Sequence, residues 1–221
     1  ASTALREGRW RDCDLLTNHH RNGTGTILDI GANYGLCTVQ ALLLSNDTVF
    51  AYEPLGKNVA LLRETIDALV AQGAVQRRRV RVHAYALGVR AGVGWMRSEA
   101  GNVGNSMLLP RSHDTMQAMQ WQAAGSVDVR TLDSVTRHLP SIGTIKLDVQ
   151  GSECDVLRGG MHTLRRASVV VAEADDRFLN THNCSATEMT ALLNSVGFAC
   201  SVVRGRSENN LMCRKRPTHP W

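Results

Sequence analysis

The sequence predicts an α/β fold: a doubly wound, mostly parallel sheet with helices on both faces, ending in an antiparallel hairpin. Three observations predict it. Short apolar runs alternate with amphipathic stretches along most of the chain, as in strand–helix–strand units. A glycine-containing turn follows the first run, where such sheets bind nucleotide-like ligands. The 221 residues, 43% of them hydrophobic, suffice for one buried core.

In the first half of the chain, three short apolar runs are predicted as strands: Thr26–Ile30, Thr48–Tyr52 and Val80–Ala84. Two helices connect them. Gly35–Leu44 is apolar nearly all round, which predicts a helix that is covered on every side. Gly56–Gln72 carries apolar residues at helical spacing and charged residues between them, which predicts an amphipathic helix with one buried face.

In the second half, three more apolar runs are predicted as strands: Ser126–Arg130, Thr144–Asp148 and Ser168–Glu173. The stretches between and after them have helical periodicity: Leu132–His138, Glu153–Arg165 and Ala186–Val196. A terminal hairpin is predicted from two short strands, Ala199–Arg204 and Leu211–Lys215, which flank a turn at Gly205–Ser207.

We expect a single domain over residues 1–221, with residues 1–24 as an N-terminal extension, because no linker, repeat or low-complexity tract divides the chain. The pattern loosens at 88–125, which is predicted as an irregular insertion. It holds short strands at Gly92–Arg97 and Ser106–Leu109 and a helical turn near Met116–Trp121. This segment forms either a substrate lid or plain core packing.

Charge and hydropathy exclude some classes of partner. The net charge is +5, and basic residues cluster at Arg77–Arg81 and Arg214–Arg216. Neither cluster contains an aromatic residue on which a base could stack, so we interpret both as solvated loops and do not expect a nucleic-acid partner. No apolar run approaches the ~20 residues of a membrane span. The oligomeric state is left open.

The cysteines and glycosylation motifs leave the compartment open. Six cysteines form no Cys-x-x-Cys pair, which argues against structural zinc. Cys200 and Cys213 would face each other across the hairpin, either as a disulfide or as two packed thiols. Asn-x-Ser/Thr motifs begin at Asn22, Asn46 and Asn183. The protein is cytoplasmic, or lumenal or secretory if an upstream signal or anchor has been removed.

The turn after the first strand is the main functional signal. It reads Asp29-Ile-Gly31-Ala-Asn33-Tyr-Gly35. Glycine adopts positive φ at little cost, and its missing Cβ lets a ligand lie against the backbone. Asp29 ends the strand, where it can accept bonds from a ligand's ammonium group or hold the loop amides. We therefore predict a cofactor site at Asp29, Gly31, Asn33 and Gly35, with a plain packing turn as the alternative.

A carboxylate at the end of the second strand identifies the kind of cofactor. Glu53 follows Gly31 by 22 residues, where an acid accepts the ribose hydroxyls of an adenosine-containing cofactor. The turn lacks the middle glycine of a dinucleotide motif, since Asn33 stands there. A cofactor without phosphates, such as S-adenosylmethionine, fits better. An NAD-dependent oxidoreductase and a non-catalytic or RNA-binding relative are the alternatives.

Several motifs together closely resemble the FkbM-type methyltransferases over roughly residues 25 to 175: Asp29–Gly35, Tyr52–Pro54, Ala86–Gly88, Thr131–Asp133, Ile145–Glu153 and Val156–Gly159. The resemblance implies a seven-stranded methyltransferase sheet and O-methylation of a sugar or polyketide hydroxyl. It adds Ala32, Pro54 and Ala86 to the cofactor site. Gln150 departs from the family, which commonly has an acid there, and the identity of the acceptor is left open.

A hydroxyl acceptor must lose a proton during or after methyl transfer, which calls for a base or a metal. Lys146 and Asp148 share one face of the fourth main strand, and Glu173 ends the next strand. We predict these three as catalytic residues, with Asp148 orienting cofactor or substrate and taking the proton. In the alternative, Asp148 only pairs with Lys146 to hold the loop. Glu153 either takes part in catalysis or stabilises the N-terminus of its helix through the helix dipole.

Other candidates are weaker. Asp148, Glu173 and Asp175 together would make an oxygen-rich magnesium site, although no spacing enforces it. His113 and His162 are alternative bases, each better interpreted as a surface histidine. Tyr34 touches the cofactor tail or packs beneath it.

Overall fold

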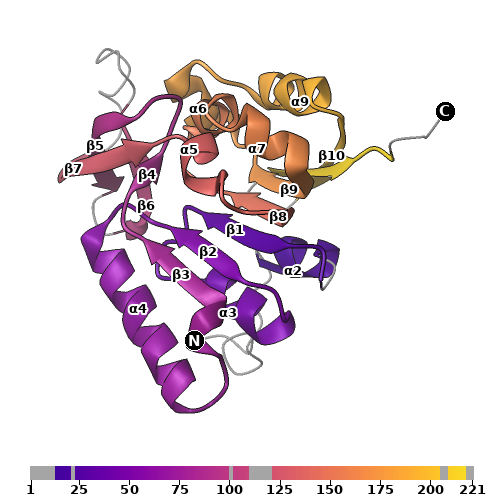
Figure 1. The fold of residues 1–221 in the computed structure, drawn as a ribbon. Helices are drawn as coiled ribbons and strands as arrows, with labels where there is room; N and C mark the ends of the chain where they lie inside the picture. Colours follow the sequence, from indigo (N-terminus) through magenta and orange to yellow (C-terminus); the bar gives the residue numbers. More distant parts are fainter. Residues whose placement is uncertain (1–12, 21–22, 100–101, 110–120, 205–208, 218–221) are drawn as a thin grey trace.

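We describe a computed structural model of the chain at residues 13–20, 23–99, 102–109, 121–204 and 209–217. Its centre is a seven-stranded sheet with the order β10-β11-β9-β8-β1-β2-β3 (Figure 1). The strands are β1 (Thr26–Ile30), β2 (Val49–Tyr52), β3 (Val80–His83), β8 (Ile142–Leu147), β9 (Ala167–Glu173), β10 (Phe198–Arg204) and β11 (Asn209–Lys215). Strands β3, β2, β1, β8 and β9 are parallel, and β11 is antiparallel to both β9 and β10. The predicted fold class is confirmed.

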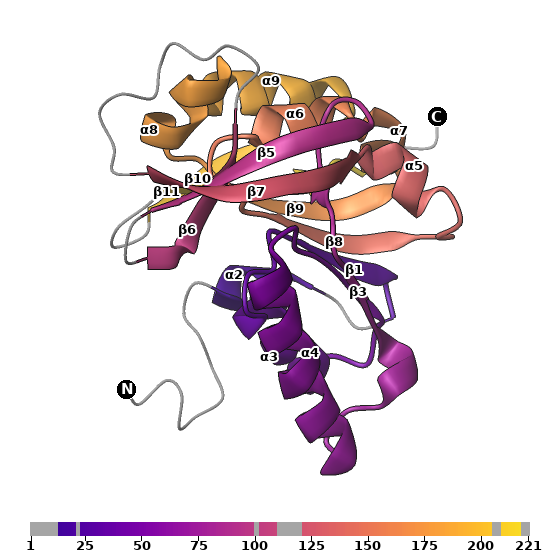
Figure 2. The same ribbon diagram turned by 90° about the vertical axis from the view of Figure 1, so that its left-hand side faces the viewer.

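Helices cover both faces of the sheet (Figure 2). One face carries α2 (Asp14–His19), α3 (Leu36–Leu44) and α4 (Gly56–Ala71). The other carries α5 (Leu132–Thr136), α6 (Glu153–Arg158), α7 (Met161–Arg166) and α9 (Ala186–Ser195). Because strand side chains alternate between faces, Ile27 of β1 packs in the core of the first face, and Leu28 and Ile30 pack in that of the second.

The segment predicted as an irregular insertion is largely a second sheet. Its four strands run in the order β4-β7-β5-β6: β4 (Ala86–Leu87), β5 (Gly92–Glu99), β6 (Asn102–Leu108) and β7 (Trp121–Arg130). The short strands predicted at Gly92–Arg97 and Ser106–Leu109 overlap β5 and β6, and the pairing of β5 with β7 makes the segment a regular sheet. Trp121 begins a strand, whereas residues 116–120 of the predicted helical turn lie outside the described residues.

The helix predicted over Glu153–Arg165 is two short helices, α6 and α7, separated by Gly159 and Gly160. A Cβ on Gly159 would lie 2.2 Å from the carbonyl oxygen of Gly88, and one on Gly160 would lie 2.6 Å from a methyl group of Leu132. The close approach of two other segments thus requires both glycines and ends the first helix there. Two short elements follow β9, α8 (Asp176–Leu179) and η4 (Asn180–His182).

Basic residues of both clusters serve the fold itself. Arg79, in the 3₁₀ turn η2 (Arg77–Arg79), donates to the carbonyl oxygens of Leu42 and Asp47 at 3.2 and 3.1 Å. Lys215 donates to the carbonyl oxygen of Leu164 at 3.1 Å and lies 4.6 Å from the ring centre of Phe198. Both clusters were interpreted as solvated loops; most of their basic residues are exposed, but Arg81 lies in β3 and Arg214 and Lys215 lie in β11.

All six cysteines are paired in disulfides: Cys13–Cys37, Cys154–Cys184 and Cys200–Cys213. Cys200 faces Cys213 directly across the hairpin, so of the two alternatives predicted for this pair the structure has the disulfide. The other two pairs were not predicted. No helix of the described residues is long and apolar enough to cross a membrane.

Candidate cofactor and catalytic site

A cleft lies at the carboxyl ends of β1, β2 and β8, beside the second sheet, with an empty volume of about 650 Å³. Six of the predicted site residues line it: Gly31, Asn33, Glu53, Pro54, Ala86 and Asp148. The other lining residues include several to which the sequence assigned no role, although Gln150 was noted as a departure from the family pattern: Tyr52, Asn58, Tyr85, Leu87, Met96 and Gln150. The described residues thus place the glycine turn, the second-strand carboxylate and the fourth-strand carboxylate around one space.

The turn after β1 requires glycine at two positions for different reasons. Gly31 has φ +80°, and a Cβ there would lie 1.7 Å from the carbonyl oxygen of Asp148. Gly35 has φ +91°, and a Cβ there would lie 2.1 Å from a methyl group of Leu62 on α4. Asn33 tolerates φ +53° between them. Gly31 therefore brings the β1 and β8 loops together at the cleft, whereas Gly35 packs the turn against α4.

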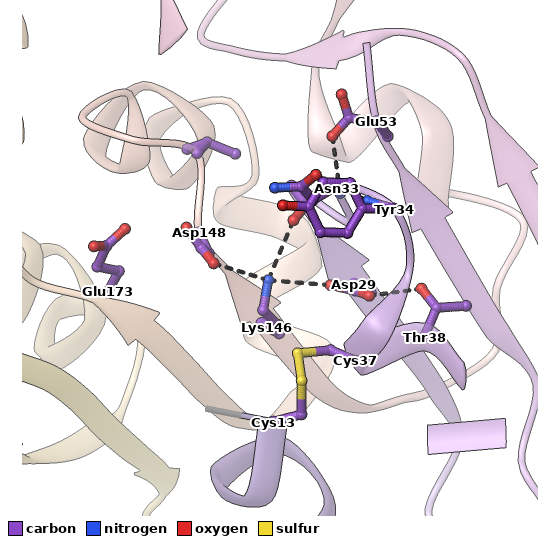
Figure 3. Close-up of polar contacts among 12 residues, drawn as sticks. Cys13, Asp29, Asn33, Tyr34, Cys37, Thr38, Glu53, Lys146, Asp148 and Glu173 are labelled. Atoms are coloured by element: carbon purple, nitrogen blue, oxygen red, sulfur yellow. Dashed lines mark hydrogen bonds and ion pairs between the residues drawn. A yellow bond between two sulfur atoms is a disulfide. The ribbon is translucent and has the colours of Figure 1, made fainter. Parts of the chain in front are cut away.

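Glu53 is buried at the end of β2 and is held by three hydrogen bonds, of which Figure 3 shows the one to the turn at Asn33. Its Oε2 accepts from the backbone N–H of Asn33 at 2.9 Å. Its Oε1 accepts from the N–H of Leu55 at 2.9 Å and from Nδ2 of Asn58 at 3.3 Å. Burial raises the pKa of Glu53, and these hydrogen bonds oppose the rise. A carboxylate oxygen has about two acceptor positions, so Oε2 can still accept from a ligand hydroxyl.

Lys146 links the two carboxylates of neighbouring strands beneath the turn (Figure 3). Its Nζ lies 3.3 Å from Oδ1 of Asp29 and 3.2 Å from Oδ2 of Asp148, and it donates to the carbonyl oxygen of Gly31 at 3.2 Å. Burial lowers the pKa of Lys146, but the charges of Asp148 and Asp29 outweigh it and hold the pKa above its ordinary value. Lys146 is therefore a permanent cation and acts electrostatically.

Asp29 is fully buried and does not line the cleft. Its Oδ2 accepts from the hydroxyl of Thr38 at 2.6 Å, which ties β1 to α3. In the structure it fixes Lys146 and the start of α3. Ala32 is also buried, and its N–H donates to the carbonyl oxygen of Tyr52 at 3.0 Å. Direct contact of Asp29 or Ala32 with a cofactor stays a prediction.

Asp148, Gln150 and Glu173 form a connected polar group. Nε2 of Gln150 donates to Oδ1 of Asp148 at 2.9 Å and to Oε2 of Glu173 at 2.7 Å. The Asp148 side chain remains 38% exposed, so it can reach a ligand in the cleft. Burial raises the pKa of Asp148, but the charge of Lys146 and the hydrogen bond from Gln150 outweigh it and lower the pKa. Asp148 is thus an anion at neutral pH, and its pairing with Lys146 is present as well.

Asp175 takes no part in this group. It caps α8 by accepting from the N–H of Arg177 at 2.9 Å and pairs with the Arg177 side chain. Within the described part of the chain, no three His, Cys, Asp or Glu side chains are placed to hold a metal ion. The predicted magnesium set of Asp148, Glu173 and Asp175 is therefore wrong, because Asp175 caps α8 and pairs with Arg177 instead.

The weaker candidates lie away from the cleft. Both oxygens of Glu153 accept from loop N–H groups, of Val149 and of Gly151, at 2.9 Å each. Glu153 thus holds the loop after β8. His162 is exposed on α7, Tyr34 is 38% exposed on the turn, and neither lines the cleft. His113 lies outside the described residues.

Three features of the cleft suit an adenosine-containing molecule. The missing Cβ of Gly31 lets a ligand approach the backbone, and Glu53 offers a carboxylate oxygen for ribose. Tyr52 lines the cleft, and its buried hydroxyl has no hydrogen-bond partner among the described residues. A buried polar atom without a partner is costly, so a bound ligand or water would relieve it.

Comparison with known proteins gives concordant results. The model of the methyltransferase FkbM domain matches residues 29–200. The 2-O-methyltransferase NoeI of Sinorhizobium fredii (strain NBRC 101917 / NGR234) is 28% identical over 190 residues, which cover 81% of this chain and 75% of that protein.

Solved structures show the same fold. A methyltransferase FkbM from Methylobacillus flagellatus KT superposes with a TM-score of 0.60 at 16% identity, over 87% of this chain and 44% of that longer chain. The chain thus spans less than half of that protein. SMU.1697c of Streptococcus mutans, solved in complex with SAH, superposes with a TM-score of 0.54 at 10% identity, over 98% of this chain and 99% of that one.

Proposed function

The chain belongs to the FkbM methyltransferase family, and from this premise we propose that it methylates a hydroxyl group of a sugar or glycan. Its methyl donor is S-adenosylmethionine. One observation carries the proposal of a hydroxyl acceptor: the partly exposed, ionised carboxylate of Asp148 faces the same cleft as Gly31 and Glu53. The relative named 2-O-methyltransferase supports an oxygen acceptor.

The residues of the cleft divide into those that would hold the donor and those that would serve the acceptor. Glu53 would accept from the ribose hydroxyls, and the turn at Gly31 and Asn33 would lie along the amino-acid tail. Pro54 and Ala86 would border the adenine. When bound, S-adenosylmethionine supplies an electrophilic methyl carbon on a positively charged sulfur, which leaves without needing a proton.

Asp148 would accept a hydrogen bond from the acceptor hydroxyl and so direct its oxygen along the line of attack, a positioning effect that is worth orders of magnitude in rate. Because Lys146 and Gln150 lower the pKa of Asp148, it is a weak base. It would therefore take the hydroxyl proton late, once the new carbon–oxygen bond has made that proton acidic. Glu173 and Gln150 would hold the carboxylate in place.

The two alternative functions fit less well. Because the chain belongs to the FkbM methyltransferase family, a methyltransferase accounts for this fold better than an NAD-dependent oxidoreductase does. The RNA-binding relative relied on the two basic clusters, which contain no aromatic residue on which a base could stack, and Arg79 and Lys215 of these clusters are engaged with backbone carbonyls of this chain. Neither observation counts against methylation of a sugar or glycan.

The test combines donor binding with acceptor screening. Titration calorimetry should show binding of S-adenosylmethionine and SAH but not of NAD. Incubation with methyl-labelled donor and separate pools of sugars, glycans, lipids, protein and RNA should label the sugar or glycan pool. Label in RNA or protein alone would overturn the proposed acceptor class.

A matched pair of variants tests the role of Asp148. D148N should lower kcat about 100-fold or more and leave SAH affinity within about threefold, because the carboxylate acts on the acceptor. D67N is the control, since Asp67 is exposed on α4 and pairs only with Arg77 at the surface. Full activity of D148N would remove it from catalysis.

A further inference from the structure

We propose that this protein matures in an oxidising compartment, where its six cysteines form three disulfides, two of them bracing the cofactor cleft, and where Asn46 carries an N-linked glycan. The function proposed above uses neither the cysteines nor the Asn-x-Thr motif. This inference therefore stands apart from the identity of the methyl acceptor.

The pairing of the cysteines is complete. The Cα atoms of the three pairs lie 5.0, 6.0 and 4.0 Å apart, and the pairs span 24, 30 and 13 residues. Cys13, Cys154 and Cys213 are fully buried. Cytosolic proteins are kept reduced and rarely carry structural disulfides, whereas secreted and lumenal proteins do so commonly. A chain that leaves no cysteine free and pairs all of them inside the fold matches the second group.

Two of the disulfides lie next to the loops that form the cleft. Cys37 is the second residue of α3, directly after the turn at Gly31–Gly35, and its disulfide ties α3 to the start of α2 (Figure 3). Cys154 is the second residue of α6, directly after the loop that carries Gln150, and its disulfide reaches the segment before α9. Each disulfide fixes one of the two helices whose N-termini position a cleft loop.

The third disulfide provides an internal comparison. Cys200–Cys213 joins β10 to β11 at the far edge of the sheet, away from the cleft strands β1, β2 and β8. Its loss should affect stability without moving a cleft loop.

Asn46 begins the motif Asn46-Asp47-Thr48 in the turn between α3 and β2 and is exposed. This turn is held in one conformation. Arg79 donates to the carbonyl oxygens of Ser45 and Asp47, and the Asp47 carboxylate accepts from the N–H of Gly23 at 2.7 Å and lies 2.8 Å from Nε2 of His20. The turn precedes β2 and so lies at the opposite end of the strands from the cleft. A glycan there would leave the cleft open.

The second described motif is a poorer acceptor. Asn183 is exposed, but the middle residue of its motif is Cys184, which is buried and bonded to Cys154. Of the two motifs that the structure describes, we therefore assign the glycan to Asn46; the motif that begins at Asn22 lies outside the described residues.

Both modifications are ordinary group transfers. Each pair of thiols loses two electrons and two protons to a disulfide-bearing oxidant, which is reduced to a dithiol. In glycosylation, Nδ2 of Asn46 bonds to C1 of a sugar carried on a lipid pyrophosphate. The C1–oxygen bond breaks, the lipid pyrophosphate leaves, and the amide loses one proton.

The first experiment is mass spectrometry of the protein isolated from its source with free thiols trapped by iodoacetamide. We expect no alkylated cysteine before reduction, six after it, and peptides joined by the three stated disulfides. Enzymatic release of N-glycans in heavy-oxygen water should convert Asn46 to labelled Asp. Alkylated cysteines without prior reduction, or an unmodified Asn46, would overturn the proposal.

The second experiment tests the bracing. In oxidised protein, the double variant C13S/C37S should weaken SAH binding at least fivefold, whereas C200S/C213S should change it less than twofold. Each should lower Tm by roughly 5 to 15 °C. Equal affinities for the two double variants and wild type would refute the bracing. If C13S/C37S does not fold, C200S/C213S titrated with SAH before and after mild reduction tests the bracing, because only the two disulfides beside the cleft remain in it to be reduced.

The outcomes separate the two proposals. Oxidised wild type that fails to bind SAH would count against the proposed function and leave the disulfide map intact. Free thiols in a protein that binds SAH and methylates a sugar would do the reverse.

Discussion

Replacing Glu53 by glutamine tests the carboxylate that we assign to ribose. The variant keeps the size of the side chain but exchanges one oxygen for an NH₂ group. In the structure both oxygens face donors: Oε2 faces the N–H of Asn33 at 2.9 Å, and Oε1 faces the N–H of Leu55 at 2.9 Å. Whichever way the amide is turned, its NH₂ group meets a donor and loses that hydrogen bond.

The expected loss of affinity follows from the bonds that a ribose would make. A hydrogen bond to a charged acceptor contributes about 1.5–3 kcal/mol, which corresponds to roughly 10- to 150-fold in Kd. N58A is the matched control. It keeps the carboxylate and removes only the longest of its bonds, at 3.3 Å, so its Kd for SAH should change less than about threefold.

The assay is calorimetric titration of E53Q, N58A and wild type with SAH and with an SAH analogue that lacks both ribose hydroxyls. If Glu53 holds the ribose, E53Q should weaken binding of SAH clearly more than binding of the analogue, which shares only the lost hydrogen bond within the protein. A penalty of equal size for both ligands would show that Glu53 only holds the turn. Unchanged affinity for SAH would refute the ribose assignment altogether.

Four further predictions follow from the site. K146M should lower the free energy of unfolding by about 3–5 kcal/mol in urea titration, because it leaves the fully buried Asp29 without its cation; a loss below about 1 kcal/mol would contradict this. G31A should abolish SAH binding in calorimetry, since its Cβ would lie 1.7 Å from the carbonyl oxygen of Asp148, whereas the exposed and unobstructed Gly73 should tolerate alanine better despite its own positive φ. Activity should survive a metal chelator, because Asp175, which would be needed beside Asp148 and Glu173 to hold magnesium, is engaged with Arg177, and inactivation reversed by magnesium would disprove it. Burial raises the pKa of Glu153 from 4.5 to about 7, so the neutral carboxyl's contribution to stability is complete below about pH 4.5 and is lost as the pH rises through about 7. The stability of wild type relative to E153Q, measured by urea titration, should therefore fall between about pH 5 and about pH 8, and a constant difference would argue against a raised pKa.

The sequence predicted those parts of the fold that depend on local pattern. The apolar run at Thr26–Ile30 and the helical spacing of Gly56–Gln72 reproduce β1 and α4 to within a residue. The strand predicted at Gly92–Arg97 is part of β5, but its pairing with β7 joins segments on either side of residues 100–120, which no local pattern reveals. The break between α6 and α7 has a similar cause, since Gly159 is required by the approach of Gly88.

The candidate site was predictable where spacing carries the signal and not where packing does. Gly31 and Glu53 could be predicted because one lies in the turn after the first strand and the other at the end of the second, and neighbouring parallel strands bring these ends to the same edge of the sheet. The hydrogen bonds by which Gln150 links Asp148 to Glu173 were not predicted. They depend on the positive φ of Gln150, +54°, which places its side-chain amide between the ends of two strands. Cys200–Cys213 was foreseen as one of two alternatives, since a hairpin sets its register. Cys13–Cys37 depends on how α2 docks, which no local pattern reveals.

The rigid hold on Glu53 has a consequence for turnover. The ribose and the amino-acid tail are common to the donor and to the spent molecule that remains after transfer, and a carboxylate held by three donors cannot tell one from the other. If it binds ribose as we propose, the enzyme would retain SAH about as tightly as it binds fresh donor. Product inhibition would then be built into the site, and the rate of methylation would depend on how quickly the surroundings remove SAH.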